Sequence, residues 1–432
     1  MKKQFIFILC GLFLCAGTIA ATDYNVLQQG AVGDGKTLNT QSLQSAIDAL
    51  HAKGGGQLYF PAGRYLTGSL QLKSNVTLYL EKEAMLLGST SPYDYPGFST
   101  EKELKVNNDH FDQALIYAEG AENIGITGEG CIDGQGRELA LTIDSLHHTG
   151  ELVDKHYNTY RKRPNTRPKL LFMSNCRKVE LRKTNFRSGA AWGLSFSLCV
   201  DLTIDSLHVE NRAYWNNDGI DISDCKDVRI SNCFINSADD GICLKSHNRG
   251  AWNDRVSISN CHIISSASAI KFGTESLGGF KNVTIDNIRI KDTFRSAIAI
   301  ESVDGAEIEN VKLENIEIVC PGRATRGMAY MSVSRLKDVP ENEKGYPEFT
   351  MFEELPSWGF YVRHVKGIQM HNVKLRLQED DFRPAFVFDR VSDVRLSDIS
   401  LPENKKAGQV VLRQTSLQSA DNAVKEYVRE VE

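Results

Sequence analysis

Four short phrases of one form decide the fold of this chain. They read Asp218-Gly-Ile-Asp-Ile-Ser, Asp240-Gly-Ile-Cys-Leu-Lys, Ser268-Ala-Ile-Lys-Phe-Gly and Ser296-Ala-Ile-Ala-Ile-Glu. Each has a small residue in second place and apolar residues in third and fifth place, which is the two-residue period of a β-strand. The phrases begin at 218, 240, 268 and 296, so the repeat is 22 to 28 residues long. Such a repeat predicts a parallel β-helix in which each repeat forms one coil.

If the coils stack, residues at the same position of successive phrases become neighbours in space and form a column. Adjacent coils of a β-helix lie about 4.8 Å apart. An earlier phrase, Trp192-Gly-Leu-Ser-Phe-Ser, adds one more coil. The third and fifth letters are expected to face the core and the fourth and sixth to face outward. The fourth column then contains Ser195, Asp221, Cys243, Lys271 and Ala299, and the sixth contains Ser197, Ser223, Lys245, Gly273 and Glu301. The sequence therefore predicts that carboxylates and lysines converge on one outer patch.

The remaining sequence predicts an all-β, single-domain, right-handed parallel β-helix over residues 22–432. An N-terminal capping helix is expected from Thr40 to Ala52, where Leu43, Ile47 and Leu50 recur at helical spacing. It would cover the first coil at the open end of the solenoid. Three polar stretches, near 91–112, 137–168 and 320–359, interrupt the strand pattern. Long insertions in solenoids usually project from one face, so these are predicted to border a binding groove.

The first 21 residues have the form of a secretory signal. Met1-Lys-Lys is followed by an apolar run and then by the small-residue stretch Thr18-Ile-Ala-Ala. The run is too short for a comfortable membrane span. Lipid attachment at Cys10 or Cys15 is disfavoured because a leucine precedes each cysteine. We expect an exported protein, periplasmic or extracellular, of unassigned oligomeric state.

Composition and residue spacing argue against several other functions. With 50 basic and 55 acidic residues the net charge is -5, which argues against nucleic-acid binding. Neither the cysteines nor the histidines have the spacing of a metal site, so no metal and no cofactor are expected. Cys176, Cys233 and Cys261 each end a Ser-Asn-Cys triplet. These triplets predict stacked turns followed by small buried side chains.

The chain resembles glycoside hydrolase family 28, the polygalacturonases and rhamnogalacturonan hydrolases, over essentially its mature length. The resemblance lies in Gly128-x-Gly-x-Ile-Asp-Gly-Gln-Gly, Trp192-Gly-Leu, Asn216-Asn-Asp-Gly-Ile-Asp and Asp239-Asp-Gly-Ile. It implies that Asp218, Asp239 and Asp240 are the catalytic carboxylates and that the anomeric centre is inverted. It also implies a pectic poly- or oligosaccharide substrate, and it gives the acid role to Asp239.

Two departures from the family pattern concern the substrate. Polygalacturonases have a Gly-His-Gly motif where Ser268 stands in the histidine's place, and an Arg-Ile-Lys motif that aligns with Ala299-Ile-Glu301. Rhamnogalacturonan-acting members similarly lack these groups and have a glutamate nearby. The resemblance therefore favours the rhamnogalacturonan branch.

The chemistry of the three aspartates supports the same assignment. Hydrolysis of a glycosidic bond needs one protonated carboxyl for the leaving oxygen and one carboxylate that activates water. Carboxylates crowded on two coils have their pKa values split, because neighbouring like charges oppose ionisation. We assign Asp239 as the general acid, with Asp218 and Asp240 positioning and deprotonating the water. Asp-Gly pairs are often only turn formers, but two in register beside Asp239 favour catalysis.

The outward columns predict the groups that bind substrate. Lys271 could hold a uronate carboxylate, or it could neutralise Glu301 or Asp221. Glu301 could accept hydrogen bonds from a neutral sugar such as rhamnose, join the acid and base set, or only pair with Lys271. Lys245 and Asp221 belong to the same predicted patch. Trp192 offers an apolar sugar platform, although an aromatic residue at a strand start often serves packing.

The sequence thus predicts a secreted inverting glycoside hydrolase acting at galacturonic-acid-containing linkages of pectin, above all rhamnogalacturonan. The nearest alternative is a polygalacturonase or exo-galacturonosidase whose missing cations come from the loops. A polysaccharide lyase on a β-helix and a noncatalytic carbohydrate-binding solenoid are the alternatives of other classes.

Overall fold

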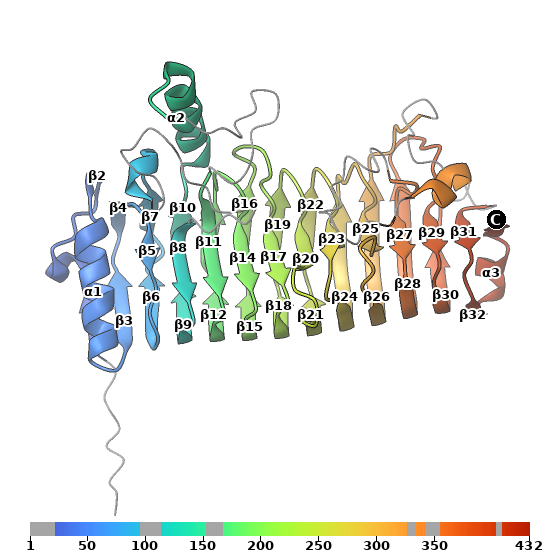
Figure 1. The fold of residues 1–432 in the computed structure, drawn as a ribbon, viewed down its shortest axis with the longest axis horizontal. Helices are drawn as coiled ribbons and strands as arrows, with labels where there is room; N and C mark the ends of the chain where they lie inside the picture. Colours follow the sequence, from blue (N-terminus) through green and yellow to red (C-terminus); the bar gives the residue numbers. More distant parts are fainter. Residues whose placement is uncertain are drawn as a thin grey trace, which may run out of the picture.

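The computed structural model describes residues 22–95, 114–152, 167–325, 333–339, 341, 355–402 and 408–432. These residues wind into one long solenoid whose coils are stacked along a single axis (Figure 1). Strands of successive coils pair in parallel and in register, as Ile220↔Ile242 and Ile270↔Ile298 show. Connections between parallel strands are almost always right-handed. The predicted parallel β-helix is confirmed.

One side of the solenoid is a sheet of twelve strands, one from each coil that it spans. Its strands are β5 (Leu70–Gln71), β8 (Ala114–Glu119), β11 (Lys169–Ser174), β14 (Leu194–Ser197), β17 (Ile220–Ser223), β20 (Ile242–Ser246), β23 (Ile270–Ser276), β25 (Ile298–Glu301), β27 (Phe360–Arg363), β29 (Phe386–Asp389), β31 (Val410–Arg413) and β33 (Val428–Val431). The four phrases form β17, β20, β23 and β25. This sheet therefore contains the predicted columns.

A bent sheet of twenty-one strands makes the other sides. Its strands are β1 (Thr22–Asn25), β2 (Asp34–Leu38), β3 (Gly56–Phe60), β4 (Gly63–Thr67), β6 (Val76–Leu80), β7 (Ala84–Gly88), β9 (Glu122–Thr127), β10 (Cys131–Asp133), β12 (Arg177–Arg182), β13 (Asn185–Arg187), β15 (Val200–Asp205), β16 (His208–Asn211), β18 (Lys226–Ser231), β19 (Phe234–Ser237), β21 (Asn253–Ser259), β22 (His262–Ser265), β24 (Phe280–Lys291), β26 (Ile308–Cys320), β28 (Val365–Leu377), β30 (Ser392–Ser400) and β32 (Leu417–Ala420).

Asparagines make several of the bends within the coils. Asn175, Asn232 and Asn260 have φ values of 54°, 56° and 54°, in the left-handed region that asparagine tolerates better than most residues. The cysteine after each of them is buried, and the eight described cysteines are free thiols. The structure thus confirms the turns and the buried cysteines predicted from the Ser-Asn-Cys triplets. Only the turns of Asn232 and Asn260 are stacked on each other, because Asn175 lies in a different turn, the one between the two sheets.

The core is formed by the third and fifth letters of the phrases. Ile220, Ile222, Ile242 and Leu244 have no exposed surface and belong to one continuous hydrophobic cluster. The second letters are small for a different reason. A β-carbon built on Gly241 would lie 2.5 Å from the carbonyl oxygen of Ala269 in the next coil, which is closer than van der Waals contact allows.

The helices lie outside this core. Helix α1 (Thr40–Ala52) lies at the N-terminal end of the solenoid with Leu43, Ile47 and Leu50 buried, so the predicted cap is confirmed (Figure 1). Short helices are α3 (Asn422–Lys425) and the 3-10 helices η1 (Val26–Gln29), η2 (Pro92–Asp94) and η5 (Val333–Asp338). Among the described helices, none has the length and apolar character needed to cross a membrane.

The interruption expected over 137–168 contains a helix that the strand pattern did not reveal. Helix α2 (Gly136–Thr149) projects from the solenoid (Figure 1) and buries Leu139, Ala140 and Ile143 on one face. These three residues have helical spacing, which was the missed signal. Parts of the three predicted insertions, residues 96–113, 153–166, 326–332, 340 and 342–354, lie outside the described residues, as do residues 1–21.

The close approach at Gly241 yields a test of the coil stacking. We expect Gly241→Ala to destabilise the protein by about 1–3 kcal/mol, because the added methyl group must push neighbouring coils apart. Ala269→Gly, one coil on, is the control for a position that already accommodates a methyl group. Calorimetric unfolding of both variants makes the comparison. A Gly241→Ala melting temperature equal to that of the unmodified chain would show that this contact does not limit the stacking.

Candidate active site

Two stacked turns bring the three aspartates together. The turns lead into β17 and β20, and Asp218 and Asp240 occupy the same place in them. The amide of Gly219 donates to the carbonyl of Asp240 at 2.9 Å, and the amide of Asp239 donates to the carbonyl of Asn217 at 3.3 Å. The trio is therefore gathered on two adjacent coils, as the register of the phrases predicted.

Buried side chains hold the first of these turns in place. Asn211 Nδ2 donates to the carbonyl of Asp218 at 2.8 Å, and Asn217 Nδ2 donates to that of Ala191 at 2.6 Å. Tyr214 donates its hydroxyl to Asp144 Oδ2 of helix α2 at 2.8 Å. The turn that contains Asp218 is thus tied by hydrogen bonds to Asn211 of β16, to the backbone of Ala191 and to Asp144 of helix α2.

Asp240 is held as a carboxylate. Its side chain is buried, Lys271 Nζ lies 3.2 Å from Oδ2, and the amide of Ser268 donates to Oδ1 at 3.2 Å. Burial acts to raise its pKa, but the charges of Lys271, Arg295 and Lys245, with the Ser268 amide, outweigh burial and lower the pKa.

The other two carboxyls are displaced in the opposite direction. Burial and the charge of Asp221 hold the pKa of Asp218 well above its usual range, although Lys245 Nζ lies 3.4 Å from its Oδ2. Burial and the charge of Asp240 raise the pKa of Asp239. Asp239 is the partly exposed member of the trio, and its Oδ1 accepts from the amide of Asp240 at 3.0 Å. One fixed carboxylate beside carboxyls of raised pKa is the condition for acid and base roles.

The predicted outer patch is buried, which corrects the expectation of an exposed surface. Asp221, Lys245, Lys271 and Glu301 point away from the hydrocarbon core, yet their exposed fractions are only 1%, 3%, 6% and 0%. Charged side chains can be buried at this level when they pair. Lys245 Nζ lies 2.5 Å from Asp221 Oδ1, so the patch neutralises itself in part.

The two columns differ in continuity. The fourth is an unbroken ladder, Asp221↔Cys243↔Lys271↔Ala299. The sixth is interrupted, because the β20–β23 register shifts after Leu244 until Ser246 pairs with Ser276. Gly273, with φ of 88°, lies in the shifted segment, and such bulges often contain a left-handed glycine. Lys245 and Glu301 are therefore not members of one continuous ladder, contrary to the sequence prediction.

Two of the predicted substrate contacts have partners within the protein. Lys271 contacts Asp240, and not Glu301 or Asp221 as the structural alternative supposed. The ring of Trp192 lies under Lys245 Nζ, 3.6 Å from its centroid, and near Lys169 Nζ at 4.9 Å. The Trp192 ring, which was expected to offer a sugar platform, therefore makes cation–π contacts with lysines of the protein itself. Substrate binding by these residues stays a prediction.

Glu301 is the least satisfied charge of the site. It has no exposed surface, and neither carboxylate oxygen accepts a hydrogen bond from the described residues. Burial raises its pKa from its ordinary 4.5 to about 7, against the opposing charges of Lys271 and Arg363. The hydroxyl of Ser268, in the place of the family's histidine, is likewise buried without a partner in the described part of the chain. Both groups retain unused hydrogen-bonding capacity beside Lys271 and Asp240.

The replacement of the family's arginine by Ala299 has a packing reason. Ala299 belongs to a second hydrophobic cluster on the outward face, with Leu336 of η5 and with Tyr361, Val387 and Val411 further along the same column. The sixth column beyond the site becomes a ladder of alternating charge, in which Asp389 pairs with Arg363 at 2.9 Å and with Arg413 at 2.8 Å. The outward face of the C-terminal coils is therefore packed with apolar and paired charged side chains, which support the adjacent site.

Sequence reasoning missed two features of the site. Arg295 lies in the turn before β25, where its charge helps to lower the pKa of Asp240 and opposes the rise in the pKa of Asp239 and Glu301. Its place directly before the fourth phrase was the available signal. The other feature is the set of contacts made by His247, a residue that none of the four phrases contains. Its Nδ1 contacts Glu275 and its Nε2 lies 3.1 Å from Ser223 Oγ, so it extends the polar face beyond Lys245.

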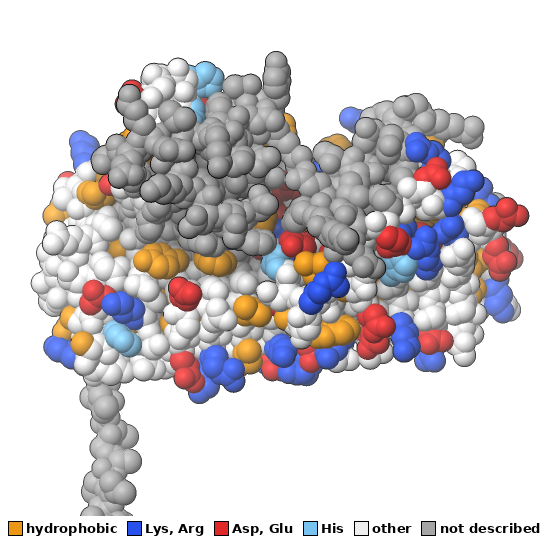
Figure 2. Space-filling view, viewed as in Figure 1, with side chains coloured by type: hydrophobic (Ala, Val, Ile, Leu, Met, Phe, Trp, Pro, Cys, Tyr) orange, Lys and Arg blue, Asp and Glu red, His pale blue; other side chains and the backbone are white. Residues whose placement is uncertain are grey.

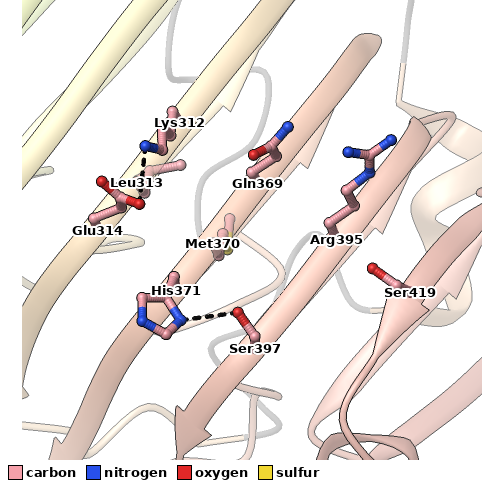
Figure 3. A pocket seen from close by; sticks show the side chains of 9 residues that line it. All are labelled: Lys312, Leu313, Glu314, Gln369, Met370, His371, Arg395, Ser397 and Ser419. Carbon is pink, nitrogen blue, oxygen red and sulfur yellow. Dashed lines mark hydrogen bonds and ion pairs between the residues drawn. The ribbon is translucent and has the colours of Figure 1, made fainter.

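The twenty-one-stranded sheet carries a hollow away from these residues. It has a volume of about 210 Å³ and lies on β26, β28, β30 and β32 of the twenty-one-stranded sheet. Figure 3 shows its short rows of side chains, with Lys312 paired to Glu314 at 2.9 Å and His371 to Ser397 at 2.9 Å. None of the predicted site residues lines it. In the part of the chain that the structure describes, no three histidine, cysteine or acidic residues are grouped so as to hold a metal ion.

Comparison with known proteins relates this site to characterised sequences. A probable polygalacturonase of Vitis vinifera is 29% identical over 321 residues, which cover 70% of this chain and 60% of that protein. An exo-poly-alpha-D-galacturonosidase of Dickeya chrysanthemi is 27% identical over 248 residues, covering 50% and 41%. The chain thus spans less than two thirds of the length of either relative.

A solved structure and two family models extend the comparison. The family 28 exopolygalacturonase of Yersinia enterocolitica superposes with a TM-score of 0.63 at 22% identity, covering 95% of this chain and 77% of that one. At that identity the likeness concerns the fold. The model named Rhamnogalacturonase A/epimerase, pectate lyase-like, matches residues 24–87. The model of Glycosyl hydrolases family 28 matches residues 56–320, which include all three aspartates. The chain belongs to glycosyl hydrolases family 28.

Proposed function

We propose that this protein hydrolyses galacturonic-acid-containing linkages of pectin with inversion of the anomeric centre, and that it does so outside the cytoplasm. The observation that carries the proposal is the opposite displacement of the pKa values of adjacent carboxyls, raised at Asp239 and lowered at Asp240. The leader-like sequence before residue 22 supports export.

Each aspartate has a role that its surroundings favour. Asp239 keeps its proton at higher pH and is partly exposed, so it can protonate the leaving glycosidic oxygen. Asp240 is ionised beside Lys271 and acts as the base that deprotonates the attacking water. Asp218, one coil away, positions that water, and Lys245 Nζ lies 3.4 Å from its Oδ2. Water attacks from the face opposite the acid, which gives inversion.

The preferred substrate in this proposal is rhamnogalacturonan. Ala299 and Glu301 stand in place of an arginine and a lysine, so the rung at β25 offers no cation to a galacturonate. A neutral sugar such as rhamnose over this rung would not be repelled by a charge on Glu301, which is buried and whose oxygens accept no hydrogen bond from the described residues.

The second candidate is cleavage of homogalacturonan, and Arg295 is the observation that favours it. Its charge acts on Asp239, Asp240 and Glu301, so it could substitute for the cations missing from β25 and hold a second uronate. The names of the sequence relatives point to the same substrate.

Digestion of matched oligosaccharides separates these candidates. Purified protein is incubated with homogalacturonan and rhamnogalacturonan oligosaccharides of equal length, and products are identified by mass. The proposal expects faster cleavage of rhamnogalacturonan. Faster cleavage of homogalacturonan would favour the second candidate, and unsaturated products absorbing in the ultraviolet would contradict hydrolysis.

Replacing the proposed acid tests its role. We expect Asp239→Asn to lower kcat by about 100- to 10,000-fold while substrate binding and the unfolding temperature are retained, because the amide keeps the shape but cannot donate the acidic proton. Steady-state kinetics and calorimetry measure both. A near-normal rate in this variant would remove Asp239 from the mechanism, and a loss confined to Asp218→Asn would transfer the acid role.

Lys271 gives a test through the pH profile. Without its charge, the pKa of Asp240 should rise, so the acidic limb of the kcat/KM profile of Lys271→Met should move to higher pH. Lys271→Arg, which keeps the charge, should restore much of the original profile. Lys312→Met, at a lysine on the twenty-one-stranded sheet, is the control. An acidic limb that stays in place in Lys271→Met would show that Lys271 does not set the ionisation of Asp240.

Glu301 should make the stability of the protein depend on pH. A carboxyl whose pKa is raised by folding binds more protons in the folded state, so stability is lost as pH rises from about 4.5 through about 7. The shift corresponds to about 3 kcal/mol. We therefore expect the unfolding free energy of Glu301→Gln, relative to the unmodified chain, to grow between pH 5 and pH 8.

Denaturant unfolding at several pH values measures this difference, and Glu119→Gln, at an exposed glutamate, is the matched control. A constant difference across the range would mean that Glu301 does not titrate near neutrality in the folded protein.

A further inference from the structure

The two most exposed large hydrophobic side chains of the described structure both lie beside the aspartates. Trp215 is 67% exposed and Phe294 is 56% exposed, whereas the other exposed large hydrophobic residues fall between 36% and 49%. Single exposed apolar side chains are normal on protein surfaces. Here, however, the two extremes occur in the stack of turns that contains Asp239.

The register places these residues on opposite sides of Asp239. The turn of Trp215 is one coil before it, because the amide of Asp239 donates to Asn217. The turn of Phe294 is two coils after it, through the bonds from Ser266 to Ser237 and from Arg295 to Ala267. At the ladder spacing, these steps correspond to about 5 Å toward the N-terminal end and about 10 Å toward the C-terminal end.

The backbone of Trp215 is rigidly held. Its carbonyl accepts from Arg167 Nη1 at 2.6 Å, and Arg167 Nη2 donates to Asn216 Oδ1 at 3.0 Å. The guanidinium of Arg167 is buried and lies 5.0 Å from the ring centroid of Tyr214. An aromatic side chain on a fixed turn loses little conformational entropy when a ligand covers it. The fold therefore presents a large apolar surface to solvent on an ordered support.

We propose that Trp215 and Phe294 are two platforms on which pyranose rings of the substrate pack, one on each side of the scissile bond. The inference rests on the proposed function and assigns its sugar-binding surface. A pyranose ring has an apolar face that can pack on the flat face of an aromatic side chain, while its hydroxyl groups stay hydrogen-bonded to polar groups or water. Arg295 directly follows Phe294, so the Phe294 platform is suited to a uronate, whose carboxylate the guanidinium can attract. The Trp215 platform accepts a ring by its shape.

This placement differs from the sequence prediction, which chose Trp192. The ring of Trp192 has lysine ammonium groups over it, whereas Trp215 is two-thirds exposed. Both tryptophans precede strands of the same sheet. Exposure, and not sequence position, distinguishes the ring that is available to a sugar.

Binding to a catalytically silenced chain tests the platforms. Each of Trp215→Ala and Phe294→Ala is combined with Asp239→Asn, and binding of a galacturonic-acid hexamer and of a rhamnogalacturonan hexamer is measured by calorimetry. We expect each substitution to weaken binding of the better ligand by about tenfold, equivalent to about 1.4 kcal/mol. Trp215→Phe and Phe294→Tyr should recover most of the affinity. Leu38→Ala, at a 48% exposed residue on the N-terminal strand β2, is the control.

Kinetics in the otherwise unmodified chain separate this proposal from the proposed function. The platforms predict a raised KM for both alanine variants with unchanged unfolding temperatures. If the unmodified chain cleaves these substrates but Trp215→Ala and Phe294→Ala behave like Leu38→Ala, the platforms are refuted and the hydrolase function stands. If the unmodified chain neither binds nor cleaves either hexamer, the proposed function fails and the platforms fail with it.

Discussion

The structure depends on one constraint, the direct stacking of coils at the spacing of a β-ladder. Stacking makes residues 22 to 28 positions apart into nearest neighbours, so each coil must repeat what its neighbours require. A small residue in second place of each phrase avoids a clash with a backbone carbonyl of the next coil, as at Gly241. Apolar third and fifth letters fill the interior. Where the stacked positions are aspartates and lysines, stacking brings like and unlike charges into contact, and these contacts form the candidate active site.

Charge pairing between coils then gives the three aspartates different protonation states, although the three side chains are chemically the same. Asp239 and Asp240 are adjacent in sequence, yet only Asp240 has Lys271 Nζ at 3.2 Å and the Ser268 amide as a donor, and only its pKa is lowered. Burial opposes ionisation of all three aspartates, so the local partner decides each protonation state. The surface elsewhere is mixed in charge, and Figure 2 shows acidic and basic side chains interspersed on the drawn side of the solenoid. Its C-terminal coils carry a packed apolar cluster and a charge ladder that support the site.

Strand periodicity and repeat spacing predicted the solenoid, its inward residues and the grouping of Asp218 with Asp240, because these follow from local pattern alone. The capping helix was predicted for the same reason. Burial of the outward lysines could not be predicted, since it depends on pairing between side chains of different coils. The register shift at Gly273 could not be predicted either, because the sequence does not show which of the 34 glycines adopts a positive φ value. Arg295 and Trp215 lie in turns, where no periodicity reports which side chains face the site.

The central claim is that stacked carboxyls act as acid and base in a direct attack by water. Proton NMR of the first product released from a pectic oligosaccharide, recorded before mutarotation, tests it most directly. The account predicts a reducing end whose anomeric configuration is opposite to that of the cleaved linkage. A product that retains the configuration would contradict it, because retention requires a carboxylate that attacks the sugar itself.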